Sequence, residues 1–327
     1  MARVIALLFA IVAIGCTDEF EVAVPDGFPA VPVPADNALT DARVSLGKRL
    51  FYDTQLSRTH EVSCGSCHLA EHAFSDPRPT SVGVDGRQGT RNAPSLVNVA
   101  YNTSFFWDGG APTLEQQAIA PIINPLEMDM KIGDVVARLD ADPTYVDAFE
   151  DAYDTRPSPG ALTKALAAFM RTIVSGNSRY DRFVRGDRTA LSESEQRGMA
   201  IFTGERGECF HCHVGFNFTN NGFRNNNLYA QYEDIGRARV TELDSDIGKF
   251  KVPTLRNVAL TAPYMHDGSL ATLEAVVEHY SSGGFQSATS DPTIRPLNLT
   301  PDEKHDLVAF LLALTDETVA TNPRLVP

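Results

Sequence analysis

Basic charge is scarce in this sequence. It has 28 lysines and arginines against 42 aspartates and glutamates, which gives a formal net charge of −14. Nucleic acid is therefore not an expected partner, because its phosphates require a basic protein surface. An acidic surface is compatible with docking to a basic protein.

The apolar run at the N-terminus, Val4–Ile14, is too short to cross a bilayer as a helix. It follows Arg3 and is typical of a secretory signal peptide covering residues 1–16. The ending Ala13-Ile14-Gly15-Cys16 resembles a bacterial lipoprotein cleavage site, at which Cys16 would become the lipidated first residue. The alternative is ordinary signal-peptidase cleavage, with Cys16 lost or incidental. Both routes predict a periplasmic protein, and the first adds a lipid anchor to the membrane.

Cysteine is also scarce, and its placement leaves no pair for a structural disulfide. Four of the five cysteines form two C-x-x-C-H motifs, at 64–68 and 209–213. Two thiols at this spacing can add to the vinyl groups of one haem, and the following histidine then ligates the iron. A redox dithiol or half a zinc site also uses C-x-x-C, but neither requires the histidine, and a zinc ribbon has its pairs closer together. The sequence predicts two covalently bound haem c groups, held by Cys64, Cys67 and His68 and by Cys209, Cys212 and His213.

Strand-like alternation longer than a few residues is absent, so the predicted fold is mainly α. Residues 17–37 are rich in proline and acidic residues and are expected to form an extended arm. Two tandem cytochrome-c-like haem domains with long irregular loops follow, at 38–180 and 181–327, with a hinge over 175–188. Capping residues Thr40, Ser192, Thr272 and Thr300 are expected to open helices, the helix opened by Thr272 ending at Gly283-Gly284. Further helices are expected over 114–120, 132–140, 143–152 and 160–174, the last ending at Gly176.

Five runs resemble the bacterial di-haem cytochrome c peroxidase and MauG family, and the likeness extends from residue 36 to the C-terminus. The runs are L-G-K-R-L-F at 46–51, R-N-A-P-S at 91–95, F-W-D-G at 106–109, P-T-L-R-N at 253–257 and P-Y-M-H-D-G at 263–268. In the peroxidases, a histidine after a Pro-Thr-Ser-x-Gly run can cap the N-terminal haem. Here Val84 occupies that position, and His72 is expected outside the distal pocket. The resemblance therefore implies an open N-terminal haem.

The sixth ligand of the C-terminal haem is methionine in peroxidases and tyrosine in MauG. Tyr280 lies on the apolar stripe of the helix opened by Thr272, while His279 is expected to face solvent. From the stripe alone, Tyr280 could equally be a core residue. The likeness to MauG favours Tyr280 as the ligand, with Met265 as the alternative.

The resemblance also implies roles for residues around the two haems. Gln117 and Glu127 match the distal side of the peroxide-binding haem, with Glu127 moving a proton during O–O cleavage. Trp107, the only tryptophan, matches an electron relay between the haems; taken alone, it would be read as a core aromatic residue. Asn92, Thr261 and Pro263 match oxygen ligands of an inter-haem Ca²⁺. Gly110 departs from the family, which usually has arginine there.

A narrower likeness is to MbnH-type di-haem enzymes, which are paired with a copper-binding MbnP-type protein. It rests on G-F-P at 27–29, V-P-A-D-N at 33–37, Y-D-R-F at 180–183, E-C-F-H-C-H-V-G-F-N-F at 208–218 and Y-M-H-D-G at 264–268. This likeness implies an oxidoreductase that uses hydrogen peroxide and a high-valent di-haem state to oxidise a partner's tryptophan to kynurenine. The alternatives are a cytochrome c peroxidase supplied by a small cytochrome c or cupredoxin, and a plain di-haem electron carrier. Val84 argues against the carrier, and Tyr280 argues against the peroxidase.

Overall fold

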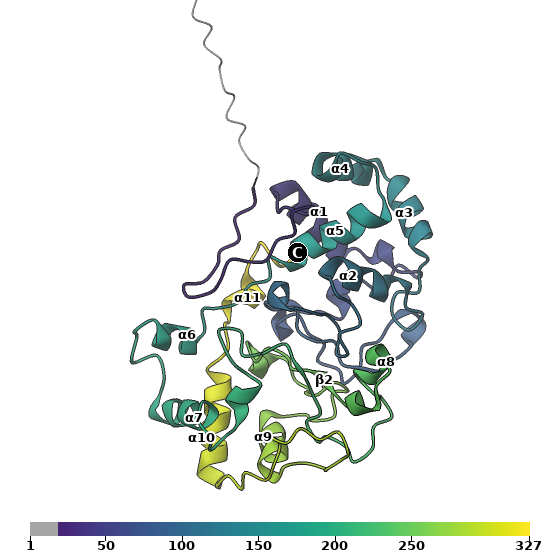
Figure 1. The fold of residues 1–327 in the computed structure, drawn as a ribbon. Helices are drawn as coiled ribbons and strands as arrows, with labels where there is room; N and C mark the ends of the chain where they lie inside the picture. The colour runs from purple at the N-terminus through teal and green to yellow at the C-terminus, as the bar shows by residue number, and fades with distance from the viewer. Residues whose placement is uncertain (1–18) are drawn as a thin grey trace, which may run out of the picture.

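The computed structural model describes residues 19–327, and within them the chain is mainly helical, as predicted (Figure 1). The two-residue strands β1 (Phe223–Arg224) and β2 (Phe250–Lys251) form an antiparallel pair. In the described part of the chain, no helix is both long and apolar enough to cross a membrane. The predicted signal peptide and Cys16 lie outside the described residues. The helices are α1 (Asp41–Tyr52), α2 (Leu114–Ile123), α3 (Ile132–Asp140), α4 (Pro143–Tyr153), α5 (Pro159–Met170), α6 (Arg179–Val184), α7 (Glu193–Phe202), α8 (Ala238–Thr241), α9 (Leu273–Ser282), α10 (Pro301–Leu312) and α11 (Thr318–Thr321).

The predicted caps start the helices at the expected places. Thr40, Ser192, Thr272 and Thr300 are the N-caps of α1, α7, α9 and α10, and the side chain of each accepts a hydrogen bond from a backbone N–H in the first turn. Gly283 ends α9 in the left-handed region, with φ 85°. Local side-chain chemistry therefore decides where these helices begin and end.

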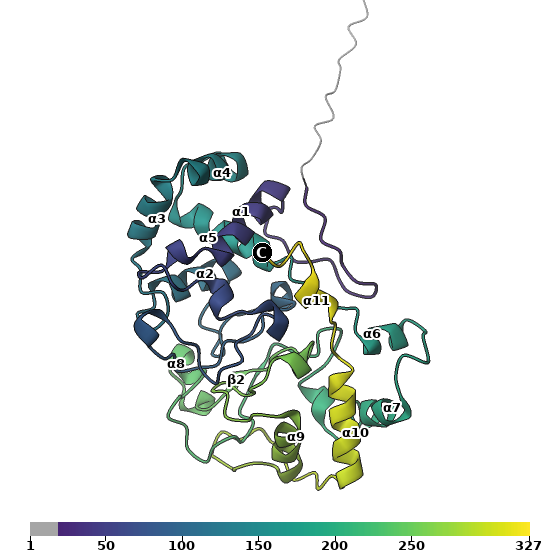
Figure 2. The same ribbon diagram turned by 180° about the vertical axis from the view of Figure 1, so that it is seen from behind.

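The two halves repeat one helix-packing contact. α1 crosses α5 at Gly47, where an added Cβ would lie 1.9 Å from the carbonyl oxygen of Ala165. α7 crosses α10 at Gly198, where an added Cβ would lie 1.9 Å from the carbonyl oxygen of Asp306. Each glycine lets two helices approach closely, and each crossing lies a short distance before a C-x-x-C-H motif in the sequence. Figure 2 shows the α1–α5 pair in one half and the α7–α10 pair in the other.

Aromatic packing repeats with the helices. Phe51 on α1 packs against Phe169 on α5, with ring centroids 5.1 Å apart. Phe202 on α7 packs against Phe310 on α10 at 5.2 Å. These rings belong to two separate clusters of buried residues, one in each half of the chain. The internal repeat expected from the sequence is thus visible in the packing.

The helix predicted over 160–174 is shorter than expected, and the prediction that it ends at Gly176 was wrong. α5 ends at Met170, and residues 171–177 are irregular. Their backbone groups bond elsewhere: the amide of Ser175 donates to Asn98 Oδ1 at 2.9 Å, and the amide of Gly176 donates to Asp316 Oδ2 at 3.1 Å. These long-range hydrogen bonds replace the helical ones.

The segment 175–188, predicted to be a hinge, contains the short helix α6. Ser178 and Asp181 form a capping box at its start, and Asp181 also pairs with the fully buried Arg256, with Nη1–Oδ2 2.6 Å. The segment is therefore tied to the C-terminal half of the chain.

The described part of the N-terminal arm has no helix, as predicted, and it packs between the halves. The ring of Phe28 lies 4.6 Å from that of Phe216 and 6.4 Å from that of Tyr101. The end of the chain returns to the N-terminal half, where Val319 and Leu325 join its buried cluster (Figure 1). The two ends of the described chain thus contribute to the packing that surrounds the site.

The buried pair Asp181–Arg256 yields a stability prediction. Replacing Asp181 with alanine leaves a guanidinium that is 2% exposed without its counter-charge, and we expect a loss of about 3–5 kcal/mol in the free energy of unfolding, measured with urea. The control is Asp140→Ala, which breaks the surface pair with Arg156, whose side chains are 58% and 40% exposed. That pair should contribute less than about 1 kcal/mol. Equal losses in both variants would contradict the importance of the buried pair.

Candidate haem-binding site

A cavity of about 610 Å³ is lined by residues of both C-x-x-C-H motifs. Its wall is mostly apolar and is made of loops and helices from both halves of the chain. Of the predicted site residues, Cys64 is not in the wall and packs against the N-terminal buried cluster instead. The others all line the cavity: Cys67, His68, Asn92, Trp107, Gln117, Glu127, Cys209, Cys212, His213, Thr261, Pro263 and Tyr280.

The two predicted proximal histidines make the same local hydrogen bonds. Each C-x-x-C forms a short 3₁₀ turn, at Cys64–Ser66 and Cys209–His211, and each histidine amide donates to the carbonyl of the first cysteine at 2.9 Å. Nδ1 of His68 lies 2.8 Å from the carbonyl oxygen of Phe74, and Nδ1 of His213 lies 2.9 Å from that of Phe218. Burial lowers the pKa of both imidazoles. A neutral ring whose Nδ1 donates to a carbonyl has Nε2 free to bind a metal.

The pKa values of the four thiols do not fit a redox-active dithiol. Burial raises the pKa of Cys64 and of Cys209 to about 12, and it also raises the pKa of Cys67 and Cys212. A disulfide oxidoreductase needs a cysteine whose pKa is lowered. Apolar pockets that hold two thiols beside one neutral histidine fit a haem attached through thioether bonds. The site and the helical fold therefore define a di-haem c-type protein.

The side of the cavity next to the first motif has no iron ligand from the 79–89 loop. Val84 is fully buried and does not line the cavity, and its amide donates to the carbonyl oxygen of Glu127 at 2.8 Å. His72 is also outside the cavity wall, with Nδ1 3.3 Å from the carbonyl oxygen of Leu260. Both placements agree with the sequence-based expectation.

Glu127 carries the carboxylate in this part of the wall. It follows α2 in a tight turn, and Asn124 Nδ2 donates to its Oε1 at 2.6 Å. Burial raises the pKa of Glu127, and the hydrogen bond from Asn124 partly opposes that shift. Gln117 lies on α2 and lines the same cavity. A buried carboxyl of raised pKa in a cavity is suited to proton transfer.

A close backbone contact holds the Glu127 turn in place. An added Cβ on Gly83 would lie 2.2 Å from the carbonyl oxygen of Leu126 and 2.5 Å from that of Glu127. Around this contact, Asp85 and Arg87 pair with Arg58 and Asp129. The 83–87 loop and the Glu127 turn therefore form one rigid unit.

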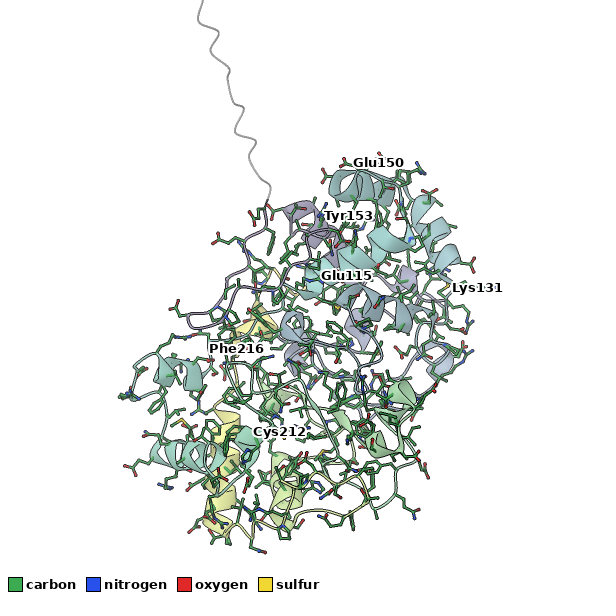
Figure 3. The ribbon with its side chains drawn as sticks, viewed as in Figure 1. Glu115, Lys131, Glu150, Tyr153, Cys212 and Phe216 are labelled. Carbon is green, nitrogen blue, oxygen red and sulfur yellow. The ribbon has the colours of Figure 1, made fainter. Side chains whose placement is uncertain are left out.

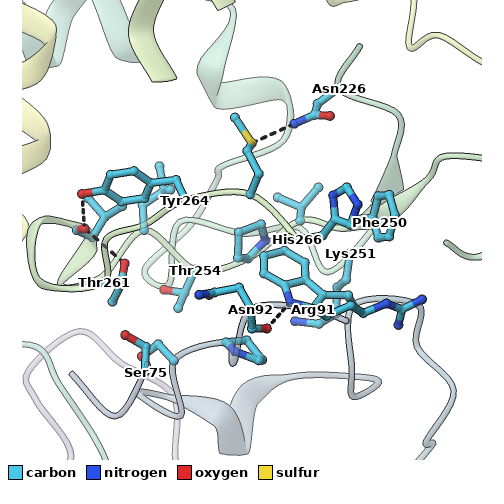
Figure 4. A pocket seen from close by; sticks show the side chains of 18 of the residues that line it. Ser75, Arg91, Asn92, Asn226, Phe250, Lys251, Thr254, Thr261, Tyr264 and His266 are labelled. Atoms are coloured by element: carbon cyan, nitrogen blue, oxygen red, sulfur yellow. Dashed lines mark hydrogen bonds between the residues drawn. The ribbon is translucent and has the colours of Figure 1, made fainter. Parts of the chain in front are cut away.

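Next to the second motif, Asn226 lies between the two candidate sixth ligands. Its Nδ2 is 3.2 Å from Met265 Sδ (Figure 4) and 3.5 Å from Tyr280 Oη. Burial raises the pKa of Tyr280 to about 12, so its phenol is neutral unless a cation lies beside its oxygen. His279 was expected to face solvent, but it is half-buried, with Nε2 2.8 Å from the carbonyl oxygen of Asn226. His279 thus holds the loop that carries Asn226.

Trp107 lies in the wall between the two motifs. Its Nε1 donates to the carbonyl oxygen of Asn92 at 2.9 Å, and its carbonyl oxygen accepts from the amide of Lys251 at 2.7 Å. The amide of Asn92 in turn donates to His266 at 2.8 Å. The indole of Trp107 is therefore fixed to the N-terminal half, and its backbone carbonyl is bonded to the C-terminal half.

The residues predicted to bind calcium lie in the same stretch of wall. Asn92 Nδ2 donates to Arg78 at 3.0 Å, which leaves its Oδ1 for a cation. The hydroxyl of Thr261 donates to the carbonyl oxygen of Val258 at 3.1 Å. The hydroxyl therefore does not bond to the carbonyl oxygen of Thr261 itself. Figure 4 shows Asn92 and Thr261 in this part of the cavity. Calcium binding stays a prediction.

Similarity to known proteins extends over nearly the whole chain. Residues 41–189 match the family described as di-haem cytochrome c peroxidase. The methylamine utilization protein MauG of Methylorubrum extorquens is 41% identical over 301 residues, which cover 90% of this chain and 85% of that protein. Cytochrome c551 peroxidase of Nitrosomonas europaea is 36% identical over 297 residues, covering 88% of this chain and 84% of that protein. The chain belongs to the di-haem cytochrome c peroxidase and MauG family.

A solved structure supports the same relationship. It is described as a MauG-like protein associated with microbial copper homeostasis, and it superposes with a TM-score of 0.89 at 37% identity. The match covers 94% of this chain and 98% of that one. The chain is therefore a family oxidoreductase, and peroxide is the substrate that its family implies.

Several polar residues of the site were not expected from the sequence. Asn124, Asn226, Lys251 and His266 all line the cavity. Asn124 follows a helix as Asx residues often do, and its distance of three residues from Glu127 could have indicated a contact. The roles of Asn226 and Lys251 depend on contacts that are remote in sequence, so no local signal identifies them.

The contact at Gly83 predicts that Gly83→Ala impairs the reaction with peroxide. The added methyl group must push the Glu127 turn away, and misplacing a catalytic carboxyl by about 1 Å can lower the rate about 100-fold. The measurement is steady-state peroxide turnover by protein of confirmed haem content. Gly89→Ala is the control, because it lies in the same loop but its Cβ would meet its nearest neighbour at 3.4 Å. Unchanged turnover in Gly83→Ala would contradict the positioning role.

Proposed function

We propose that this chain is a periplasmic di-haem enzyme that uses hydrogen peroxide to oxidise a side chain of a partner protein. The observation that carries this proposal is the asymmetry of the cavity: two equivalent histidines face different surroundings. Next to His68, the wall offers a carboxyl group but no ligand from the 79–89 loop. Next to His213, it offers Tyr280 and Met265.

The haems would be attached through Cys64 and Cys67 and through Cys209 and Cys212, with His68 and His213 as proximal ligands. When bound, they supply the iron redox chemistry and the site of peroxide reduction. The boundary near residue 180 would divide the chain into two haem domains. The open position above the first motif would admit a small molecule such as peroxide.

Glu127 would act as the general acid and base at the peroxide position. Its carboxylate accepts a proton from one peroxide oxygen and returns it to the departing one, so the carboxyl group is unchanged overall. Asn124 holds Oε1 in place while the other carboxylate oxygen remains available. Gln117 would orient the peroxide from α2.

Tyr280 would be the sixth ligand beside the second motif, with Asn226 holding its oxygen. An anionic oxygen ligand lowers an iron reduction potential relative to methionine. Trp107, fixed between the halves, would carry electrons from one haem site to the other. A calcium ion held by Asn92, Thr261 and Pro263 would lie close to this path.

The support for a protein substrate comes from relatives. The similarity to a MauG-like protein associated with copper homeostasis favours a periplasmic copper-binding partner of the MbnP type, with tryptophan converted to kynurenine. The second candidate is a cytochrome c peroxidase, which the similarity to cytochrome c551 peroxidase favours. In that case a small cytochrome c or cupredoxin would donate the electrons.

Mixing the protein with peroxide and a copper-binding partner should distinguish the two functions. We expect mass spectrometry to show oxygen added to one partner tryptophan, followed by loss of carbon. Tyr280→Phe should suppress this modification, because the second haem would lose its oxygen ligand. An unmodified partner together with rapid peroxide-dependent oxidation of reduced cytochrome c would favour the peroxidase function.

The hydrogen bond from Asn124 predicts a pH effect. If ionised Glu127 accepts the proton of peroxide, the rate falls on the acid side, below the pKa of Glu127. Asn124→Asp retains an acceptor for the Leu126 amide but replaces the donor to Glu127 with a like charge. The pKa of Glu127 should rise, and the acid limb of kcat/KM for peroxide should move to higher pH.

The matched control is Asn102→Asp, which adds a carboxyl to the wall of the same cavity at another position. Glu127→Gln should remove the limb altogether. An acid limb that stays in place in Asn124→Asp would mean that another group titrates.

A further inference from the structure

Most cationic side chains of the cavity wall already have a carboxylate partner. Six lysines and arginines line the cavity, and four of them form ion pairs: Arg91 with Asp108 and Asp234, Arg224 with Asp291, Arg256 with Asp181, and Arg295 with Glu208. Among residues 19–327, Arg239 and Lys251 make no such pair. Arg239 lies on the exposed surface, where water can solvate it.

Lys251 is different, because its side chain is partly buried in the cavity wall. Burial lowers the pKa of Lys251 to about 8. Its ammonium group has no hydrogen-bond partner in the described part of the chain. With a pKa of about 8, the group is mostly protonated at neutral pH. An unpaired cation in the wall of a mostly apolar cavity favours the binding of an anion there.

The backbone fixes Lys251 in the space between the two motifs. Lys251 lies on β2 opposite Phe223, and its amide donates to Trp107 at 2.7 Å. The preceding Phe250 stacks on His266, with ring centroids 3.7 Å apart and an interplanar angle of 15°. Figure 4 shows Lys251 and His266 in the wall near Asn92. The backbone of Lys251 is therefore held in the wall of the cavity.

We propose that Lys251 is the binding residue for a carboxylate of a bound haem, at the point where the wall joins Trp107. Haem carries two propionate groups, and each needs a counter-charge or a hydrogen-bond donor when it is taken out of water. Among the described residues, Lys251 is the partly buried cation of the cavity wall that has no carboxylate partner. The inference rests on the proposed attachment of two haems, and it adds the residue that sets the charge beside the relay tryptophan.

The test compares Lys251→Met with Lys131→Met. Both changes remove one lysine, but Lys131 is an exposed residue in the N-terminal half, well away from Cys212 (Figure 3). Loss of a cation beside a haem favours its more positive, oxidised form. We expect the equilibrium constant for reduction of at least one haem to fall about tenfold in Lys251→Met, a shift of about 59 mV to lower potential in a spectroelectrochemical titration. Lys131→Met should shift the potentials much less, and Lys251→Arg should retain most of the original value.

Haem content, measured as the pyridine haemochrome, distinguishes a failure of the proposed function from a failure of the proposed role of Lys251. Fewer than two haems in the unaltered protein would overturn the proposed function itself. Two haems in every variant, with potentials in Lys251→Met equal to those in Lys131→Met, would overturn the role of Lys251 alone. If Lys251→Met does not accumulate as folded protein, Lys251→Gln is titrated in its place and judged by the same criterion.

Discussion

The hydrogen bond between each predicted proximal histidine and a backbone carbonyl constrains a large part of the chain. His68 depends on Phe74, and His213 depends on Phe218, so each ring is held by the loop that follows its own motif. Those loops must be rigid although they contain almost no regular structure. The helices provide that rigidity, because the crossings at Gly47 and Gly198 place phenylalanine rings against the loops: Phe51 against Phe74, and Phe202 against Phe218. The repeated helix pairs can therefore be understood as supports for two histidine rings.

Buried polar side chains hold the halves together. Nδ2 of Asn98 donates to Asn217 Oδ1 at 3.0 Å. Nδ2 of Asn257 donates to Ser175 Oγ at 3.3 Å. All of these side chains are at least nine-tenths buried. Buried polar groups are unfavourable without partners, so such a network stabilises one relative placement of the halves over others. The proposed relay through Trp107 would require such a single placement.

The sequence predicts best what depends on neighbours in the chain. The C-x-x-C-H turns and the caps at Thr40, Ser192 and Thr300 are local, and the structure confirms the helix starts. The predicted end of α5 was wrong because the side chains of Asn98 and Asp316, which are remote in sequence, accept hydrogen bonds from backbone amides. A longer helix would have used these amides for its own hydrogen bonds. The positions of Glu127 and Tyr280 in the cavity were expected only through the resemblance to a family. The sequence did not predict that Asn226 and Lys251 line the cavity, because nothing near them in the sequence indicates which residues they contact.

Asn226 shows how a small change in this framework can alter the chemistry of the second site. Its amide is within reach of both Met265 and Tyr280, so one loop residue supports either candidate ligand. His279, on the same helix as Tyr280, binds the backbone of Asn226 and holds the loop to that helix. A sulfur ligand and an anionic oxygen ligand stabilise different oxidation states of iron. Because Asn226 reaches both side chains, we propose that the choice between Met265 and Tyr280 as the ligand separates a peroxidase from an enzyme that oxidises a protein.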